Sequence, residues 1–184
     1  MSQVLVLTGS PSATSRTAAL AGCVAARLRD DGHEVRTVAL RDLPPAALLS
    51  ADTRDPQIAE IVQALDAAQG VVVASPIYKA AYSGLLKTLL DLLPQTALAG
   101  KLVLPLVTGG TPAHVLALDY ALRPVLTALA AEHVLPGRFV LDQHVQLVGG
   151  EVLLDPAAAA SLWTVVDAFA AALQARSQLP VAAR

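Results

Sequence analysis

The chain is poor in cysteine, in aromatic residues and in charge. It has one cysteine, Cys23, so an internal disulfide and a metal site built on several cysteines are excluded. Aromatic residues make up 3%, too few for the stacking platforms that bind single-stranded nucleic acid. Charged residues make up only 15% and the net charge is -2. We therefore expect neither a nucleic acid nor an anionic membrane surface as a partner.

Long hydrophobic runs and targeting signals are also scarce. The first apolar run covers only residues 4–7 and no basic segment precedes it, so we expect no signal peptide. The longest uncharged stretch lies between Lys101 and Asp119, and prolines and glycines make it a poor membrane span. We expect one domain over residues 1–176, a frayed tail over 177–184 and a cytoplasmic location.

What the sequence does contain is an alternation of short apolar runs with helical patterns. Continuous apolar runs predict strands buried on both faces, as in a parallel sheet, at residues 4–7, 71–74, 102–107 and 139–141. A weaker run at residues 35–40, interrupted by Arg36 and Thr37, predicts an edge strand. Helical spacing begins near residues 17, 56, 85, 112 and 156. This alternation, with right-handed crossovers, predicts a three-layer α/β sandwich. Pro105 predicts a bulge or break in its strand, and residues 41–54 are expected to form a surface loop.

The segment after the first expected strand suits a phosphate. Residues 8–17 offer hydroxyls, backbone amides, Arg16 and the start of a helix. An ordinary turn capped by Ser15 is the simpler alternative. No Gly-x-Gly occurs, and the only Gly-Lys pair precedes a strand, so a dinucleotide fingerprint and a P-loop are excluded. In an open parallel sheet ligands bind beyond the carboxyl ends of the strands, so a mononucleotide phosphate fits this position.

Two further strand ends carry unusual residues. Residues 75–84 hold two of the three tyrosines, in a proline-shaped loop that can lie against a flat ring or against a neighbouring subunit. Residues 108–114 hold paired glycines, which allow close backbone approach to a ligand. His114 there is either a ligand contact or a half-exposed histidine of a first helical turn. No metal-ligand spacing, nucleophile elbow or carboxylate pair accompanies these loops, so we expect no metal and a flavin as the source of chemistry.

Four segments together resemble a known family. Gly9-Ser10-Pro11, Ser15-Arg16, residues 76–87 (Pro-Ile-Tyr-Lys-Ala-Ala-Tyr-Ser-Gly-Leu-Leu-Lys) and residues 108–111 (Thr-Gly-Gly-Thr) are similar to the NADPH-dependent FMN reductases of flavodoxin-like fold. The resemblance extends in particular to the reductase component of two-component alkanesulfonate monooxygenase systems. It covers the chain before Leu141, and the residues that follow match no motif.

This resemblance implies a five-stranded parallel sheet of order 2-1-3-4-5 and an FMN site at its carboxyl edge. The implied phosphate contacts are Ser10, Ser15, Arg16 and Thr17. The implied border of the flavin ring is Pro76, Ile77, Tyr78 and Lys79, and the implied lining of its pyrimidine side is Thr108, Gly109, Gly110 and Thr111, with His114 as a polar contact. NADPH or NADH would give a hydride to the flavin, and reduced FMN would leave for a separate flavin-dependent monooxygenase.

The resemblance also implies a homo-oligomer, either dimer or tetramer, with Tyr120 on a π-bulge at the tetramer interface. A regular helix with an ordinary interface tyrosine is the alternative. Ser12 stands where family members often have arginine, and Arg16 is the residue that could compensate. Lys79 and Arg123 are candidates for a 2′-phosphate contact, and the coenzyme preference stays open. Two other functions remain: a quinone or azo reductase that retains FMN, and an FMN electron carrier, although flavodoxins are usually much more acidic.

Overall fold

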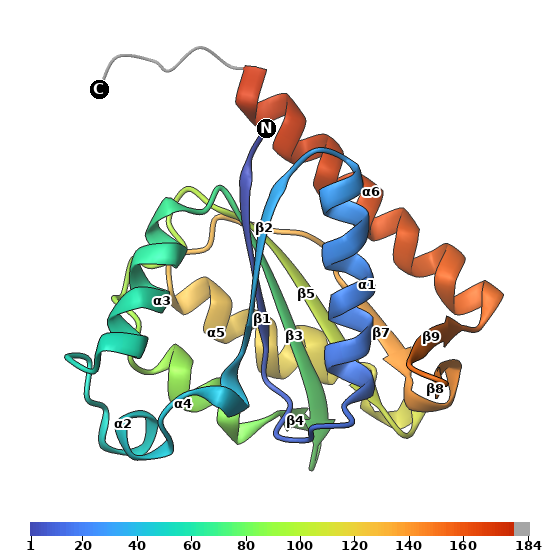
Figure 1. Cartoon of the computed structure of the whole chain (residues 1–184), viewed down its shortest axis with the longest axis horizontal. Coiled ribbons are helices and arrows are strands. Elements are labelled where there is room, and N and C mark those ends of the chain that lie inside the picture. The colour runs from blue at the N-terminus through green and yellow to red at the C-terminus, as the bar shows by residue number, and fades with distance from the viewer. Residues whose placement is uncertain (179–184) are drawn as a thin grey trace.

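The centre of the protein is a parallel sheet that is buried on both faces (Figure 1). In this computed structural model, which describes residues 1–178, the strands β1 (Gln3–Thr8), β2 (Glu34–Ala39), β3 (Gly70–Tyr78), β5 (Leu102–Gly109) and β6 (His133–Val134) lie in the order β2-β1-β3-β5-β6. Strand β7 (Arg138–Leu141) also pairs in parallel with β5. Because β6 and β7 share the fifth position, the predicted flavodoxin-like order 2-1-3-4-5 is confirmed.

Helices cover both faces of the sheet, and the predicted three-layer sandwich is confirmed. On one face α1 (Arg16–Asp30) and α6 (Pro156–Gln178) pack on the sheet. The other face is covered by α2 (Pro45–Ser50), α3 (Pro56–Ala67), α4 (Gly84–Leu90) and α5 (Arg123–Ala128). Side-chain caps begin several of these helices: Ser15 starts α1, Asp55 starts α3 and Ser83 starts α4.

The last helix, α6, extends beyond residue 176, where the sequence predicted the end of the domain. It is long and apolar enough to cross a membrane by length and composition alone. Its buried face nevertheless packs Leu162, Val166 and Phe169 into the core, as in a helix of a folded domain. The helix continues through Gln178, two residues into the tail that the sequence predicts to be frayed. The rest of that expected tail, residues 179–184, lies outside the described residues.

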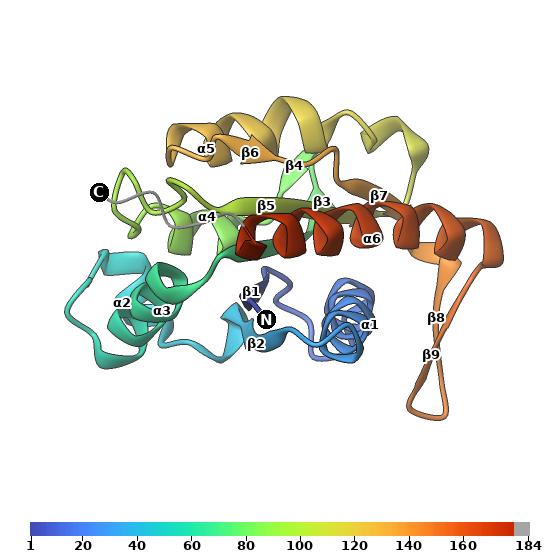
Figure 2. The same cartoon turned by 90° about the horizontal axis from the view of Figure 1, so that it is seen from above.

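Two segments expected to be loops, and a third for which the sequence offers no motif, contain regular structure. The stretch 41–54 is not a simple loop: a 3₁₀ turn (Leu40–Asp42) leads into α2, which opens at Pro45 and buries Ala47 and Leu48. Strand β3 runs on past residue 74 and turns back as β4 (Ala81–Tyr82). Beyond β7, strands β8 (Val145–Val148) and β9 (Glu151–Leu154) form a hairpin that projects from the body (Figure 2).

Prolines interrupt two other elements. Pro105 does not break its own strand, since β5 is continuous through it. The break lies in the strand next to it, which is divided into β6 and β7. The single helix predicted from residue 112 is divided: a 3₁₀ turn (Pro112–His114) precedes a π-helix (Leu118–Leu122), and α5 follows. The π-helix contains Tyr120, as the family resemblance implied. Pro124 explains the π-helix, since its ring would clash with the carbonyl of residue 120 in a straight α-helix.

One buried histidine makes the fold sensitive to acid. His33 is 6% exposed, and neither ring nitrogen has a hydrogen-bond partner within residues 1–178. Burial, and then the nearby N-terminal ammonium, lowers the pKa of His33, while Asp31 opposes the shift. The folded protein therefore disfavours the imidazolium form.

We predict that the free energy of unfolding falls as the pH drops below about 6.5, the usual pKa of histidine, because the unfolded chain then binds more protons at residue 33. The stabilisation is fully present above that pH and is lost as the pH falls through the lower pKa of the folded state. Urea unfolding at about pH 7.5 and about pH 5.5 measures the loss. His33→Gln, which does not titrate, should show a smaller loss, and an equal loss in both proteins would contradict the prediction.

Candidate functional site

The three predicted strand-end segments meet at the carboxyl edge of the sheet, at the lower end in Figure 1. The hydroxyls of Thr17 on α1 and Thr108 at the end of β5 share a buried hydrogen bond of 2.7 Å. Ser83 donates its hydroxyl hydrogen to the carbonyl of Gly9, joining the second segment to the first. In the β3–β5 register Pro76 lies opposite Thr108. The parallel sheet therefore brings these segments into one site, as the sequence predicted.

A network of buried serines fixes the relative positions of the first two segments. Ser83 accepts a hydrogen bond from the Leu86 amide at the start of α4 (3.1 Å), and its own amide donates to the Ser75 hydroxyl (2.9 Å). Gly9 packs so closely against α4 that an added Cβ would lie 2.7 Å from Cβ of Leu86. Glycine at this position is therefore required by the close approach of the loop to the helix.

The first segment forms a small polar cavity of about 160 Å³. Ser10, Ser15 and Thr17 contribute buried hydroxyls. Ser15 caps α1 through the Ala18 amide at 3.0 Å, whereas the amides of Arg16 and Thr17 lie in the first turn and have no acceptor within the helix. No acidic residue lies in that turn, so the positive end of the helix dipole is not neutralised there. The cavity is lined by Ser10, Ser12, Thr14, Ser15, Arg16, Thr17, Pro76, Ile77, Tyr78, Thr108 and Asp142.

Arg16 is anchored beside this cavity. Its Nε donates to the carbonyl of Val145 (3.1 Å), at the start of the β8–β9 hairpin. Its two Nη groups have no partner among the described residues, so they can donate to an anion. The hairpin, which no sequence motif suggested as part of a site, thus helps to orient a residue that the sequence singled out.

Two residues of this site belong to no motif of the sequence. Arg41 donates from Nη1 to the carbonyl of Ser12 (2.9 Å), so a second guanidinium lies beside the loop. It comes from the 3₁₀ turn after β2, in the stretch interpreted as a surface loop. Asp142, just after β7, lines the cavity with a carboxylate. The only sequence signal for Arg41 and Asp142 is that each follows the end of a strand. Many residues share that property, so it did not identify these two as site residues.

The second wall of the site is the β3–β4 hairpin. Pro76, Ile77 and Tyr78 line the cavity, and Tyr78 is 50% exposed. The two turn residues, Lys79 and Ala80, both have left-handed backbones, with φ of 51° and 63°. Such a conformation costs a non-glycine residue roughly 1–2 kcal/mol. Strain of this kind is retained where the surrounding structure enforces it, often at ligand sites.

The phenol of Tyr82 on this hairpin and the ammonium of Lys87 on the following helix keep their protons. Burial raises the pKa of Tyr82, and Asp91 adds to that effect while Lys87 opposes it. The Lys87 ammonium donates to Asp91 at 2.6 Å, which raises the pKa of Lys87. At neutral pH neither Tyr82 nor Lys87 can therefore act as a general base. Within residues 1–178 no group of three potential metal ligands is gathered either.

Five predicted site residues lie beside the cavity without lining it. Lys79 is exposed at the tip of the hairpin turn, and Gly109 ends β5. Gly110 and Thr111 follow, and the Thr111 hydroxyl accepts from the Ala113 amide (3.3 Å). His114 closes the 3₁₀ turn with partial exposure. Their places along the edge of the sheet are compatible with contacts to the part of a ligand that extends beyond a phosphate.

A larger hollow of about 540 Å³ lies elsewhere, between the π-helix, β7 and the start of α6. It shares no lining residue with the smaller cavity and is mostly apolar. The polar donors gather in the smaller cavity. Hydroxyls, free amides and a guanidinium there fit a phosphate monoester. The adjoining hairpin offers an apolar and aromatic wall for a flat ring.

Comparison with known proteins agrees with this geometry. Residues 2–146 match the family model described as NADPH-dependent FMN reductase. The chain is 44% identical over 179 residues to an FMN reductase (NADPH) of Escherichia coli K12, covering 97% of this chain and 94% of that protein. It is 48% identical over 147 residues to an FMN reductase (NADPH) of Pseudomonas putida KT2440, covering 80% and 75%. The apo crystal structure of the NADH:FMN oxidoreductase EMOB superposes with a TM-score of 0.88 at 42% identity, covering 98% and 92%.

We predict that Arg16→Ala weakens FMN binding by about tenfold to about a hundredfold, because charge-assisted hydrogen bonds contribute about 1.5–3 kcal/mol. Riboflavin, which has no phosphate, should lose little affinity. Flavin fluorescence titration measures both dissociation constants. Arg27→Ala, on the same helix but away from the cavity, is the control. Equal losses for the two flavins would remove Arg16 from the phosphate site.

Proposed function

Because this chain belongs to the NADPH-dependent FMN reductase family and is an NAD(P)H:FMN oxidoreductase, we propose that it releases reduced FMN to a separate flavin-dependent monooxygenase. FMN and NAD(P)H are its substrates. The partner that we propose is a monooxygenase of the alkanesulfonate type, in keeping with the motif at residues 76–87. We also propose a cytoplasmic location, where NAD(P)H is regenerated.

The observation that carries this proposal is the contrast between the two walls of the site. The phosphate cavity is built from buried hydroxyls and helix-start amides, whereas the hairpin that would border the flavin ring is exposed at Tyr78, Lys79 and Ala80. A site of this kind holds FMN by one end and leaves its ring accessible. Accessibility serves both the approach of the nicotinamide and the departure of the reduced flavin.

The reaction needs little acid–base chemistry from the protein. The bound flavin accepts a hydride from NAD(P)H at N5 and a proton from water, so NAD(P)H is oxidised and FMN is reduced. The chain supplies binding and orientation: Arg16 and the α1 amides hold the phosphate, and the β3–β4 hairpin positions the ring.

The coenzyme preference depends on a contact to the 2′-phosphate of NADPH. Four of the five N–H groups of Arg123 already donate to protein oxygens, so this residue is the weaker candidate. Lys79 is the stronger candidate because it is exposed at the turn of the hairpin. Relatives of similar identity are described with different coenzymes, NADPH for the Escherichia coli protein and NADH for EMOB.

We further propose that the protein is a dimer or tetramer with Tyr120 in a subunit interface. Tyr120 lies in the π-helix and is 78% exposed, beside Leu116 at 59% and Val115 at 48%. Exposed apolar side chains that gather in this way commonly mark protein interfaces.

The proposed release of FMN is tested by NADPH oxidation with purified apo-protein, titrated with FMN from below one equivalent to a large excess. If FMN is a substrate, the rate continues to rise well beyond one equivalent and then saturates. Full activity at one tightly held equivalent would instead indicate a prosthetic flavin and another acceptor, such as a quinone or azo compound. No oxidation at any FMN level would favour an electron carrier and would contradict the proposal.

The interface proposal predicts that Tyr120→Ala reduces the size of the oligomer or changes flavin release, with little effect on folding, because the side chain is exposed in the single chain. Light scattering after size exclusion and stopped-flow flavin release measure these effects. Thr127→Ala, on the exposed side of α5, is the control. An unchanged mass and an unchanged release rate would exclude Tyr120 from this role.

A further inference from the structure

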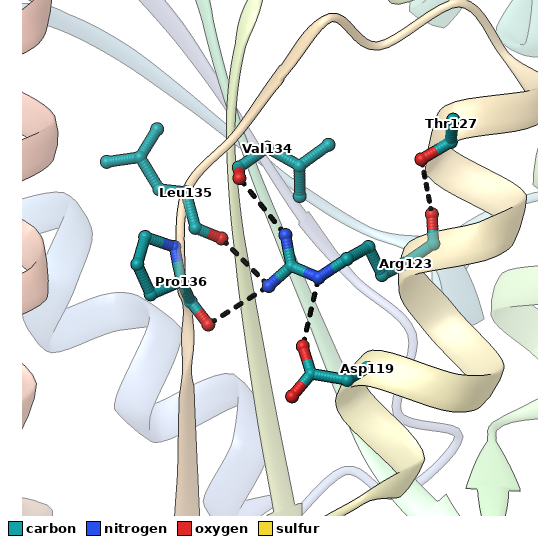
Figure 3. Close-up of polar contacts among 6 residues, drawn as sticks. All are labelled: Asp119, Arg123, Thr127, Val134, Leu135 and Pro136. Carbon is teal, nitrogen blue, oxygen red and sulfur yellow. Dashed lines mark hydrogen bonds and ion pairs between the residues drawn. The ribbon is translucent and has the colours of Figure 1, made fainter.

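One guanidinium joins the π-helix to the split fifth strand (Figure 3). Arg123 donates from Nε to the carboxylate of Asp119 in the π-helix at 2.9 Å. On its other side, Nη1 donates to the carbonyl of Val134 (3.0 Å), and Nη2 donates to the carbonyls of Leu135 and Pro136 (3.2 Å each). Four acceptors on two elements are therefore held by a single side chain.

Pro105 explains why one of these carbonyls needs such a partner. The Leu135 amide donates to the carbonyl of Val103 at 2.8 Å. In a regular parallel ladder, the Leu135 carbonyl would then accept from the amide two residues further along β5. That residue is Pro105, which has no N–H. Even a partly buried carbonyl without a donor costs free energy, and Arg123 provides the missing donor.

Gly137 allows the strand to rejoin the sheet after this gap. Its φ is +68°, and an added Cβ would lie 2.4 Å from the carbonyl oxygen of Pro105. The chain between β6 and β7 therefore follows Pro105 closely and leaves the ladder only briefly. The carbonyls that Arg123 binds lie immediately before this glycine.

Arg123 is also the residue that ends the π-helix. The Arg123 amide donates to the carbonyl of Leu118, five residues back, which is the bond that defines the wider π turn. The ion pair with Asp119 fixes the side chain over that turn. Pro124 makes a straight α-helix unfavourable, but it does not determine where the resulting π turn lies against the sheet. The hydrogen bonds from Arg123 to the carbonyls between β6 and β7 fix where the π turn lies against the sheet.

We infer that Arg123 is the positioning residue of the π-helix, holding it in place by bridging Asp119 to three carbonyls of the split strand, one of which Pro105 leaves without a donor. This position bears on the flavin site because β4 packs against the π-helix. Strand β4 is the outer strand of the hairpin that would border the flavin ring. The connection to flavin binding rests on the proposed function, whereas the positioning of the π-helix does not.

Amide hydrogen exchange tests the positioning role. Arg123→Gln keeps a polar side chain but cannot bridge four acceptors, so exchange in residues 115–128 should rise about tenfold or more, with little change in β1 and α1. Arg123→Lys should not restore protection, because a single ammonium cannot replace three nitrogens. Arg27→Gln, which removes an exposed ion pair to Asp167 (3.0 Å), is the matched control and should leave residues 115–128 unchanged.

Three results would overturn the role of Arg123: unchanged exchange in residues 115–128 of Arg123→Gln, an equal rise throughout the chain, or full protection in Arg123→Lys. The first would show that the π-helix holds its place without the bridge. The second would indicate general destabilisation, and the third would show that positive charge alone is sufficient.

Flavin titration of the same variants tests the connection to the site. Arg123→Gln should weaken FMN and riboflavin by the same factor, because the disturbance reaches the ring-side hairpin and not the phosphate cavity. A loss confined to FMN, or none for either flavin, would contradict this connection. Failure of the proposed function would show separately, as wild-type protein that gives full activity at one equivalent of FMN, and it would leave the exchange comparison intact.

Discussion

Strands β1, β3 and β5 lie parallel and are buried on both faces, and this arrangement determines where a polar site can form. Burial on both faces leaves polar side chains room only at the ends of the strands. Parallel alignment then places the segments after all three strands at the same edge. The Thr17–Thr108 and Ser83–Gly9 hydrogen bonds join those segments, so the phosphate cavity and the ring-side hairpin form one unit.

The division of the fifth strand into β6 and β7 shows how a local defect can be repaired by a distant side chain. Pro105 cannot donate to its neighbour, and the neighbouring strand divides into β6 and β7 around it. Arg123 binds the carbonyls at that division and holds the π-helix by the same contacts. Through Arg123, the gap beside Pro105 is connected to the π-helix that contains Tyr120.

Similarity to known reductases and the geometry of the site support the same chemistry from independent observations. The matched family region, residues 2–146, contains the three strand-end segments and the π-helix. Residues beyond it contribute as well, because α6 covers one face of the sheet. Val145 on β8, near the end of the matched region and after the last recognisable motif, anchors Arg16. The part of the chain without recognisable motifs is thus needed for the core and supports the site.

The sequence by itself determined the parallel sandwich, its strand order through a family resemblance, and the three segments that form the site. Apolar runs, capping residues and turn residues are local signals, and they report burial and helix starts directly. Some errors were also local: Pro124 indicated a break in the predicted helix, and Gly149-Gly150, at φ of 60° and 88°, is typical of a hairpin turn. Only the tertiary structure decided that Arg41 donates to the Ser12 carbonyl and that Arg16 donates to the Val145 carbonyl. It also decided that Arg123 donates to the Leu135 carbonyl opposite Pro105. These contacts join residues far apart in the chain, and which donor meets which acceptor depends on the packing of whole elements.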